Sequence, residues 1–417
     1  MSILIVHKTN LSRRQHLARA ARYAAEHGEE LVLLMENATW ETGMVDRVVS
    51  VDTSDVDEVL AAVKAETAPV SGVITFAEAL VPAVARVAAE LGLPWVGEHT
   101  AQLARDKYRM RVAAAAGDVP QPRFGLARTV AEALEVADHV GYPLVLKPVL
   151  GTGSMFVRSV ADAAELAEHF EFFREGAWAQ FTKDPLHLAA MREYDGALLL
   201  EEFVPGPEIS VESIVADGVT HHVAIHDKPL PTGPTFEEVY ACTPTRLPAD
   251  VADAAAKAAA DVHVALGIEV GGTHVEFRLR GGTEPILLEA AARLGGGPIY
   301  RSVLLSTGVD MVAAALDLVT GRTPTIEPRE QPVAVGFWNI FPAHAGRFVA
   351  AHGVDEARAD ERVVELDIYR EPGDQLAVPP QTFQGHGHLM FTAASVDELD
   401  STFRELTDLV RLETEPA

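Results

Sequence analysis

Short apolar runs and amphipathic stretches alternate along the first hundred residues. The apolar runs predict strands, and the stretches between them have the 3.6-residue period of helices. The predicted strands are residues 2–6, 30–35, 45–51, 70–76 and 95–96, and the predicted helices are residues 11–27, residues 55–66 and a third that ends at Leu91. This alternation is typical of a parallel sheet with helices on both faces. No G-x-G-x-x-G follows the first strand, so dinucleotide binding is not predicted.

The middle of the chain mixes helices with strands that carry charged residues. Helices are predicted at residues 99–117, 130–139, 161–194 and 248–266, and strands at residues 144–149, 156–160, 198–204, 208–215 and 223–226. Lys147 lies inside an apolar strand, where a lysine is costly to desolvate unless it has an anionic partner. The Gly/Ser loop at residues 150–155 follows at once, and its backbone N–H groups can approach and cover a phosphate.

Residues 271–298 predict two strands joined by a turn at Gly281 and Gly282. Glu276 and Glu289 would then stand on neighbouring antiparallel strands. Two carboxylates on rigid strands suit a Mg²⁺ ion that must also hold polyphosphate. Arg293, four residues after Glu289, can clamp a carboxylate or a phosphoryl oxygen. The alternative is a surface hairpin whose charges are simply solvated.

After residue 300 the pattern becomes rich in strands. A helix is expected at residues 303–319 and a Pro-rich linker at residues 321–332. Strands follow in VAVGFWNIF, GRFVAA, RVVELDIY and GHLMFTAAS, and a last helix is expected at residues 396–412. His386 and His388 are expected at the surface, and no metal is assigned to them.

Composition and charge limit the classes of protein that remain. At 417 residues the chain should form two or three domains. A net charge of −27 argues against non-specific binding to nucleic acid, although a few lysines and a metal can still hold a nucleotide. No apolar run reaches the roughly 18 residues of a membrane span, and no signal peptide is recognised. The single cysteine, Cys242, fits a reducing cytoplasm, which is the expected location.

Two further groups of carboxylates are candidate ligand contacts. Glu78 directly follows the predicted strand at residues 70–76, at the edge where parallel sheets bind ligands. Alternatively, the carboxylate of Glu78 only stabilises the N-terminus of the helix that follows. Glu201, Glu202 and Glu208 fall within eight residues around a Pro-Gly-Pro turn.

The order of these features resembles the ATP-grasp superfamily of carboxylate–amine and carboxylate–thiol ligases. The features that follow one another in this order are Lys107, Lys147 with its Gly/Ser loop, Glu201 to Val204, Glu208, Glu276, Glu289 and Arg293. The resemblance covers the whole chain and implies an α/β (α+β) fold in three blocks. These are a Rossmann-like parallel-sheet domain at residues 1–99, an ATP-grasp domain at residues 100–325 with a mobile lid at about residues 120–197, and a β-rich α+β domain at residues 326–417.

The resemblance also implies roles for individual residues. Lys107 and Lys147 would hold the ATP phosphates beneath the loop that contains Ser154, and Lys228 is a weaker phosphate contact. The adenine and ribose would meet Glu201, Glu202, Phe203, Val204 and Glu208. Glu276 and Glu289 would bind two Mg²⁺ ions, with Mn²⁺ as an alternative. Lys147, Arg293 and Gly296 would be catalytic, and Glu78, Glu238, Arg293 and Gly296 would meet the substrates.

Two positions depart from the commonest pattern of the superfamily. Glu-x-Asn-x-Arg is replaced by Glu289-Ala290-Ala291-Ala292-Arg293, so one metal ligand is absent, and water or phosphate could fill the vacancy. This departure, and the separation of thirteen between the two glutamates, resemble the L-amino-acid ligases. In that subgroup a glutamate and a histidine three residues later face the substrates. The matching positions are Glu238 and Ala241, so the glutamate is present and the histidine is absent.

The implied reaction is ATP- and Mg²⁺-dependent formation of an amide or peptide bond between amino acids or amino-acid-like metabolites. It would pass through an acyl phosphate, with release of ADP and phosphate. Another ATP-grasp enzyme, such as a carboxylase or a ligase of small metabolites, remains an alternative. A non-catalytic nucleotide-binding module is the third reading. No nucleic-acid or membrane partner is expected, and a homodimer stays open.

Overall fold

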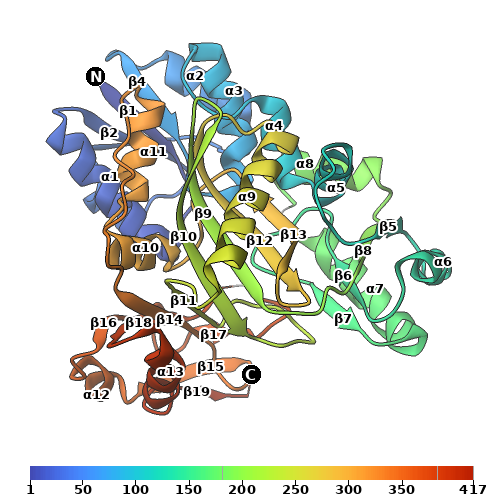
Figure 1. Cartoon of the computed structure of the whole chain (residues 1–417). Helices are drawn as coiled ribbons and strands as arrows, with labels where there is room; N and C mark the ends of the chain where they lie inside the picture. The colour runs from blue at the N-terminus through green and yellow to red at the C-terminus, as the bar shows by residue number, and fades with distance from the viewer. Residues whose placement is uncertain (181, 383, 417) are drawn as a thin grey trace.

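A computed structural model describes residues 1–180, 182–382 and 384–416. Within these ranges the strands form four sheets, and Figure 1 shows how they are arranged. The N-terminal sheet lies at the upper left, a small sheet with its helices at the right, and a long central sheet between them. The C-terminal block lies beneath the central sheet. The fold is therefore mixed α/β with the parallel sheet first and a strand-rich C-terminal block, as the sequence predicts, and the later sheets are antiparallel.

The N-terminal sheet is parallel and has the strand order β3-β2-β1-β4. Its strands are β1 (Ser2–Val6), β2 (Glu30–Met35), β3 (Arg47–Ser50) and β4 (Val70–Ile74), and its helices are α1 (Arg14–Glu26), α2 (Val56–Lys64) and α3 (Val81–Leu91). Both faces of β1 are apolar and buried, because Ile3 and Ile5 pack with α1 while Leu4 and Val6 pack with α2 and α3. This burial on two faces explains why the strands are continuous apolar runs.

A second unit consists of a four-stranded antiparallel sheet with helices on both faces. Its order is β5-β8-β6-β7, from β5 (Phe124–Ala127), β6 (Leu144–Lys147), β7 (Arg158–Val160) and β8 (Leu198–Glu202). The helices are α6 (Val130–Val140), α7 (Ala163–Ala179) and α8 (Pro185–Glu193). Leu146 and Leu200 face a core formed with α6 and α7, whereas Leu199 faces a smaller cluster with Trp178 and Tyr194. This unit contains the residues of the expected lid and extends through β8, so we call it the lid, and its mobility stays a prediction.

The central sheet is antiparallel and has eight strands, in the order β13-β12-β9-β10-β11-β14-β18-β16. Its first five strands in sequence are β9 (Glu208–Ala216), β10 (Val219–Leu230), β11 (Tyr240–Thr243), β12 (Gly271–Arg280) and β13 (Glu284–Ala291). Successive side chains of β12 point to opposite faces of the sheet. Val275, Phe277 and Leu279 face α9 (Ala249–Leu266), so the polar residues between them face the opposite side.

The C-terminal strands β14 (Ala334–Ile340), β18 (Gly387–Ala393) and β16 (Val363–Ile368) extend the central sheet, because β14 pairs with β11. A three-stranded sheet lies beside them, with β15 (Gly346–His352), β17 (Gln375–Leu376), β19 (Arg411–Glu415), α12 (Val354–Arg358) and α13 (Leu399–Thr407). The expected boundary at residue 326 therefore separates blocks that share one sheet, and the three domain boundaries stay predictions.

Three predicted helices are each broken into two. The stretch expected at residues 161–194 is α7 followed by α8, which the Asp184 side chain caps. The helix expected at residues 99–117 is α4 (Glu98–Arg105) followed by α5 (Lys107–Ala116), because Asp106 is extended and its side chain accepts a hydrogen bond from the backbone N–H of Arg109. The helix expected at residues 303–319 is α10 (Ile299–Thr307) followed by α11 (Met311–Val319). Gly308 ends α10 in the left-handed region, and Asp310 caps α11.

Three further predictions are wrong. Trp95 and Val96 form no strand, since Pro94 lacks an N–H to donate and Val96 instead fills the core beside α4. The last helix ends at Thr407, and the chain then continues as β19, which pairs with β15. His386 and His388, expected at the surface, are buried at 2% and 5% exposure.

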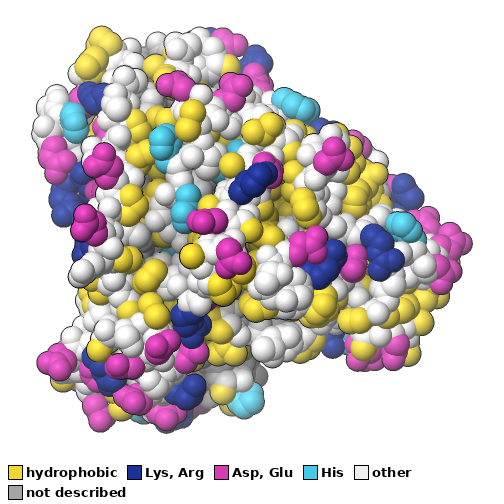
Figure 2. Space-filling model, in the orientation of Figure 1, with side chains coloured by type: hydrophobic (Ala, Val, Ile, Leu, Met, Phe, Trp, Pro, Cys, Tyr) yellow, Lys and Arg dark blue, Asp and Glu magenta, His cyan; other side chains and the backbone are white. Residues whose placement is uncertain are grey.

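The apolar helices α10 and α11 belong to the core between the N-terminal and central sheets. Tyr300, Val303 and Val312 pack with Ile5 and Leu17 of the N-terminal sheet and its helix. In the described ranges no single helix is long and apolar enough to cross a membrane, and α10 and α11 pass that test only as a pair bent by 104°. On the face seen in Figure 2, acidic side chains are interspersed with Lys and Arg, consistent with a net charge of −27.

Replacing Gly206, in the turn between β8 and β9, is expected to destabilise the fold. Its φ is 127°, and a Cβ there would lie 2.0 Å from the carbonyl oxygen of Leu279. Gly218 has a φ of 76° but no atom within 4 Å of the same position, so Gly218→Ala should cost only the left-handed strain of about 1–2 kcal/mol. Gly206→Ala should lower the free energy of unfolding further, as measured by urea denaturation. Equal losses in the two variants would contradict the steric argument.

Candidate active site

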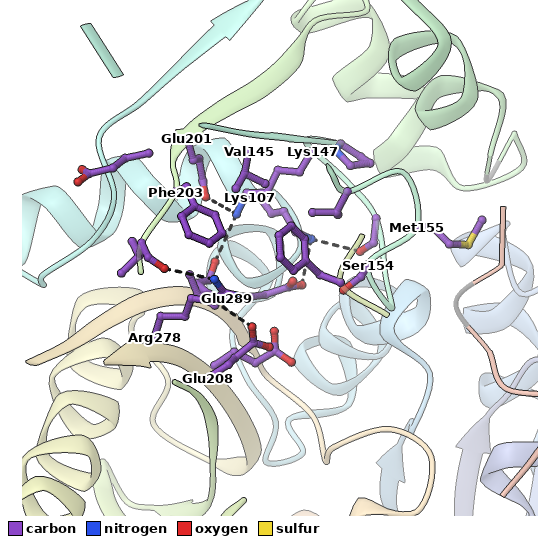
Figure 3. A pocket seen from close by; sticks show the side chains of 18 of the residues that line it. Lys107, Val145, Lys147, Ser154, Met155, Glu201, Phe203, Glu208, Arg278 and Glu289 are labelled. Carbon is purple, nitrogen blue, oxygen red and sulfur yellow. Dashed lines mark hydrogen bonds and ion pairs between the residues drawn. The ribbon is translucent and has the colours of Figure 1, made fainter. Parts of the chain in front are cut away.

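A pocket with an empty volume of about 680 Å³ lies between the lid and the central sheet. The lid lines it with β6, the Gly/Ser loop and the end of β8, and the central sheet lines it with β9, β12 and β13. Figure 3 shows the side chains of Lys107, Lys147, Glu201 and Glu289 directed toward one another in this pocket. The predicted nucleotide and metal residues that line it are Lys107, Lys147, Ser154, Glu201, Glu202, Phe203, Val204, Glu208, Glu276 and Glu289.

The two expected metal ligands lie directly opposite each other on adjacent strands. Glu276 of β12 pairs in register with Glu289 of β13, and the register shifts just after Glu276. Each carboxylate meets one lysine: Lys107 Nζ lies 3.0 Å from Glu289 Oε1, and Lys228 Nζ lies 2.5 Å from Glu276 Oε1. Two adjacent carboxylates that open into a pocket rich in lysines are a donor set that fits Mg²⁺ with polyphosphate. Ala291 adds no ligand.

Lys228 lies among three carboxylates. Besides Glu276, its Nζ lies 3.5 Å from Glu208 Oε1 and 3.6 Å from Glu238 Oε1. Burial opposes its charge, but Glu276, Glu238 and Glu208 together raise the pKa of Lys228 well above its usual value. Burial raises the pKa of Glu238, and Lys228 acts in the opposite direction. In this structure Lys228 therefore neutralises carboxylates, and its expected contact with phosphate stays a prediction.

The sequence did not reveal two buried residues beside Glu276, which are His274 and Glu212. His274 Nδ1 lies 2.6 Å from Glu212 Oε1, and its Nε2 lies 3.1 Å from Glu276 Oε1. Burial opposes the charged imidazole, but Glu212 and Glu276 raise the pKa of His274 to about 10. The signal was the alternation of HVEFRL, which puts His274, Glu276 and Arg278 on one face of β12. His274 can thus fix the orientation of the Glu276 carboxylate.

Lys147 has the anionic partner that its apolar strand requires. Its Nζ lies 2.6 Å from Glu201 Oε2, and Glu201 also accepts two hydrogen bonds from Arg111, at 2.7 and 3.1 Å. Burial lowers the pKa of Lys147 to about 8, although Glu201 acts in the opposite direction. The side chain of Glu201 is thus engaged with two cations, and its expected contact with adenine stays a prediction.

Aromatic and backbone groups form the rest of the pocket wall. The guanidinium of Arg278 lies 4.9 Å from the ring centre of Phe203 and 5.1 Å from that of Phe236. Such a platform can stack on the face of a base. Glu202 is held by Arg123 at 3.1 Å and by Arg280 at 3.5 Å. Lys107 also reaches the carbonyl oxygen of Gly151 at 3.4 Å, which joins the Gly/Ser loop to the central sheet.

The glycine loop, residues 295–297, brings together residues that are distant in sequence. Arg293 forms a buried ion pair with Glu78. Burial favours the neutral acid, but Arg293, Arg105 and Lys107 hold the pKa of Glu78 below its usual range. Arg13 donates to the carbonyl oxygen of Gly295 at 2.8 Å, and a Cβ on Gly296 would lie 3.6 Å from Arg13 Nη2. The two expected substrate residues Glu78 and Arg293 thus meet, and Arg13 is an additional cation that the sequence did not reveal.

Three family models match separate parts of the chain. The ATP-grasp N-terminal domain matches residues 21–95, the ATP-grasp domain matches residues 140–300, and the L-amino acid ligase C-terminal domain 2 matches residues 339–415. The matches follow one another in the order of the expected blocks. They cover most of the chain, including the hairpin with Glu276 and Glu289.

Individual proteins show the same similarity. The chain is 26% identical to the Sinorhizobium fredii protein y4rH, over 98% of this chain and 82% of that protein. It is 29% identical to the alanine–anticapsin ligase of Bacillus subtilis, over 72% of this chain and 64% of that enzyme, slightly under two thirds of its length. The crystal structure of an L-amino acid ligase from Bacillus licheniformis superposes with a TM-score of 0.81 at 24% identity, covering 100% of this chain and 99% of that one.

Proposed function

The chain belongs to the ATP-grasp superfamily, as an ATP-dependent carboxylate–amine ligase related to the L-amino-acid ligases, and from this we propose that it joins two amino acids or amino-acid-like metabolites. The proposed products are an amide, ADP and phosphate. The observation that carries the proposal is the facing pair of Glu276 and Glu289, each beside a lysine, in a pocket that also contains Lys147. Cytoplasmic location and a homodimer remain expectations.

The first proposed step activates the acid. A carboxylate is a poor electrophile, so one of its oxygens attacks the γ-phosphorus of ATP, the bond to the bridging oxygen breaks, and ADP leaves. Lys107 and Lys147 would hold the phosphate oxygens and offset the charge that builds on the transferring group. Phe203 and Val204 would contact the adenine with their backbone, and Glu208 the ribose hydroxyls.

Glu276 and Glu289 would hold Mg²⁺, or Mn²⁺ in its place, and a bound ion would neutralise charge on the β- and γ-phosphates. In this structure the charge of the two carboxylates is balanced by lysines. Lys228 Nζ lies 2.5 Å from Glu276, and Lys107 Nζ lies 3.0 Å from Glu289. Lys107 would then pass from Glu289 to the phosphates when nucleotide and metal arrive. His274 would keep the Glu276 carboxylate in one orientation throughout.

The second proposed step forms the amide. The amine nitrogen attacks the acyl carbon, the carbon–oxygen bond to phosphate breaks, and the departing phosphate carries away the proton that the nitrogen loses. Arg293 and the N–H groups of the glycine loop would stabilise the tetrahedral oxyanion. Glu238 would orient the incoming amine. Water must be excluded, so the lid with Ser154 is proposed to close over the pocket.

The test is ATP-dependent phosphate release by the purified protein with single amino acids and with pairs of them. Amide formation predicts release that requires two substrates and a product whose mass is the sum of both minus one water. Release with bicarbonate and an amine acceptor would instead indicate a carboxylase. Absence of turnover with every acid would favour the nucleotide-binding module and contradict the proposal.

The pH dependence of ATP use is expected to follow Lys147. Burial disfavours the charged form of Lys147 and so lowers its pKa. Of the charged groups that face it, Glu201 raises this pKa, whereas Arg111 and Lys107 lower it further. A lysine is charged below its pKa, so kcat/KM for ATP should fall as the pH rises through about 8. Lys147→Arg should move the fall to higher pH, because a guanidinium stays charged. A wild-type profile that stays flat through this value would contradict the assignment.

A further inference from the structure

A second pocket, with an empty volume of about 730 Å³, lies where the N-terminal and C-terminal blocks meet. Its walls come from the start of α1, the glycine loop with Pro298, the start of α10, and the ends of β16 and β18. Figure 1 shows these C-terminal strands beneath α10. Among the described residues, this pocket and the one under the lid share no lining side chain. A ligand here would leave the nucleotide pocket free.

Three polar residues on neighbouring strands of the central sheet lie between this second pocket and Glu238. Asp367 of β16 lies opposite His388 of β18, which lies opposite Asn339 of β14. Residues opposite each other on antiparallel strands share a face of the sheet. Asn339 donates from Nδ2 to the carbonyl oxygen of Glu238 at 3.0 Å. Gly297 also lines the pocket, so its inner end lies at the loop proposed to hold the oxyanion.

The walls carry both signs of charge, and among the described lining residues the side chains of Asp367, Glu371 and Arg14 have no hydrogen-bond or ion-pair partner. By contrast, Glu365 is engaged by His388 at 3.0 Å, Gln15 at 3.3 Å and Arg301 at 3.5 Å. Few lining residues are apolar. An unpaired carboxylate and an unpaired guanidinium across one pocket match a molecule that itself carries both charges.

A metal centre is the competing use of this pocket. One ligand atom each from Glu365, Asp367 and His388 lie within 4.8 Å of one another. Both ring nitrogens of His388 are already engaged, however, because Nδ1 lies 2.5 Å from the Tyr369 hydroxyl and Nε2 contacts Glu365. Three arginines, Arg14, Arg301 and Arg370, also line the pocket and would repel a cation. These observations favour an organic zwitterion over a metal ion.

We propose that this second pocket binds the acceptor substrate, a polar or basic amino acid whose amine points to the glycine loop. Arg14 and Arg301 would receive its carboxylate, and Asp367 would receive its polar side chain. This inference rests on the proposed function, since only a ligase that transfers an acyl group to an amine needs an acceptor site. It adds to that function the place and the chemical class of the second substrate.

The test separates acid activation from transfer to the acceptor. Hydroxylamine is a small nucleophile that traps an acyl phosphate as a hydroxamate without a binding pocket. Asp367→Asn and Arg14→Gln should leave ATP-dependent hydroxamate formation unchanged but raise the KM for L-lysine, L-histidine or L-serine by about tenfold or more. Neither residue has a partner to lose, so both variants should fold. Asp355→Asn, fully exposed on α12, is the matched control and should change neither reaction.

Each other outcome bears on the proposal in a distinct way. An unchanged KM for every amino acid acceptor, or a parallel loss of hydroxamate and amide, would overturn the acceptor site while leaving the ligase function in place. A transition metal held at one equivalent by the wild-type protein and lost in Asp367→Asn would reassign the pocket as a metal centre. If the wild-type protein forms no hydroxamate with any acid, the proposed function itself fails, and the acceptor role fails with it.

Discussion

Glu289→Gln is expected to lower kcat/KM for ATP-dependent ligation by on the order of 10³-fold, because it removes one of two protein carboxylates from the proposed metal site. Glutamine keeps the length and shape of the side chain. Its amide oxygen can still accept a hydrogen bond from Lys107, which lies 3.0 Å from the carboxylate in the native protein. The midpoint of thermal unfolding should therefore change little, so lost activity would report on the site rather than on the fold.

Glu284→Gln is the matched control for this variant, because Glu284 begins the same strand, β13, and its side chain is about half exposed. Steady-state rates for both variants should be measured across a titration of Mg²⁺. The Glu284 variant should follow the wild-type curve, and the Glu289 variant should keep its roughly 10³-fold lower kcat/KM even at saturating metal. Full activity of Glu289→Gln would show that the facing glutamates do not hold the ion.

The hairpin that carries this site was predictable from sequence because its signals are local. Period-two alternation in β12, the apolar run in β13 and two glycines between them determine the strands, the turn and therefore which carboxylates are neighbours. The Gly/Ser loop and the order of lysines and glutamates are likewise visible along the chain. The alternation of strands and helices along the first hundred residues likewise identified the N-terminal parallel sheet.

The sequence does not predict the structure correctly where a single residue, or a partner distant in sequence, determines it. Asp106 and Gly308 interrupt helical periods that look continuous, because one capping oxygen or one left-handed residue outweighs the pattern. The pairing of Lys228 with Glu276 spans 48 positions and depends on β10 and β12 flanking β9. Similarly, Asp367 and His388 meet because β16 and β18 are neighbours. Strand order of this kind is set by the packing of the whole domain, which local periodicity does not encode.

Arg293→Ala is expected to reduce amide formation by about 10²–10³-fold, the usual cost of removing one group that stabilises an oxyanion. The Kd of ATP should change little, since Arg293 does not line the nucleotide pocket. The substitution also leaves the carboxylate of Glu78 buried at 8% exposure without its ion-pair partner. Breaking a buried pair on one side costs about 3–5 kcal/mol of stability, so a loss of activity by itself would be ambiguous.

A second variant resolves this ambiguity. Glu78→Gln combined with Arg293→Met removes both charges, so the free energy of unfolding should return toward the wild-type value while amide formation stays low. Recovery of both stability and activity would give Arg293 a purely structural role. If Arg293→Ala instead weakens ATP binding and leaves transfer to the amine intact, the arginine belongs to the nucleotide site. Lost transfer in a stable double variant that still binds ATP, together with retained transfer in Glu78→Gln alone, places Arg293 at the tetrahedral oxyanion. This position is next to the glycine loop, whose Gly297 also lines the proposed acceptor pocket.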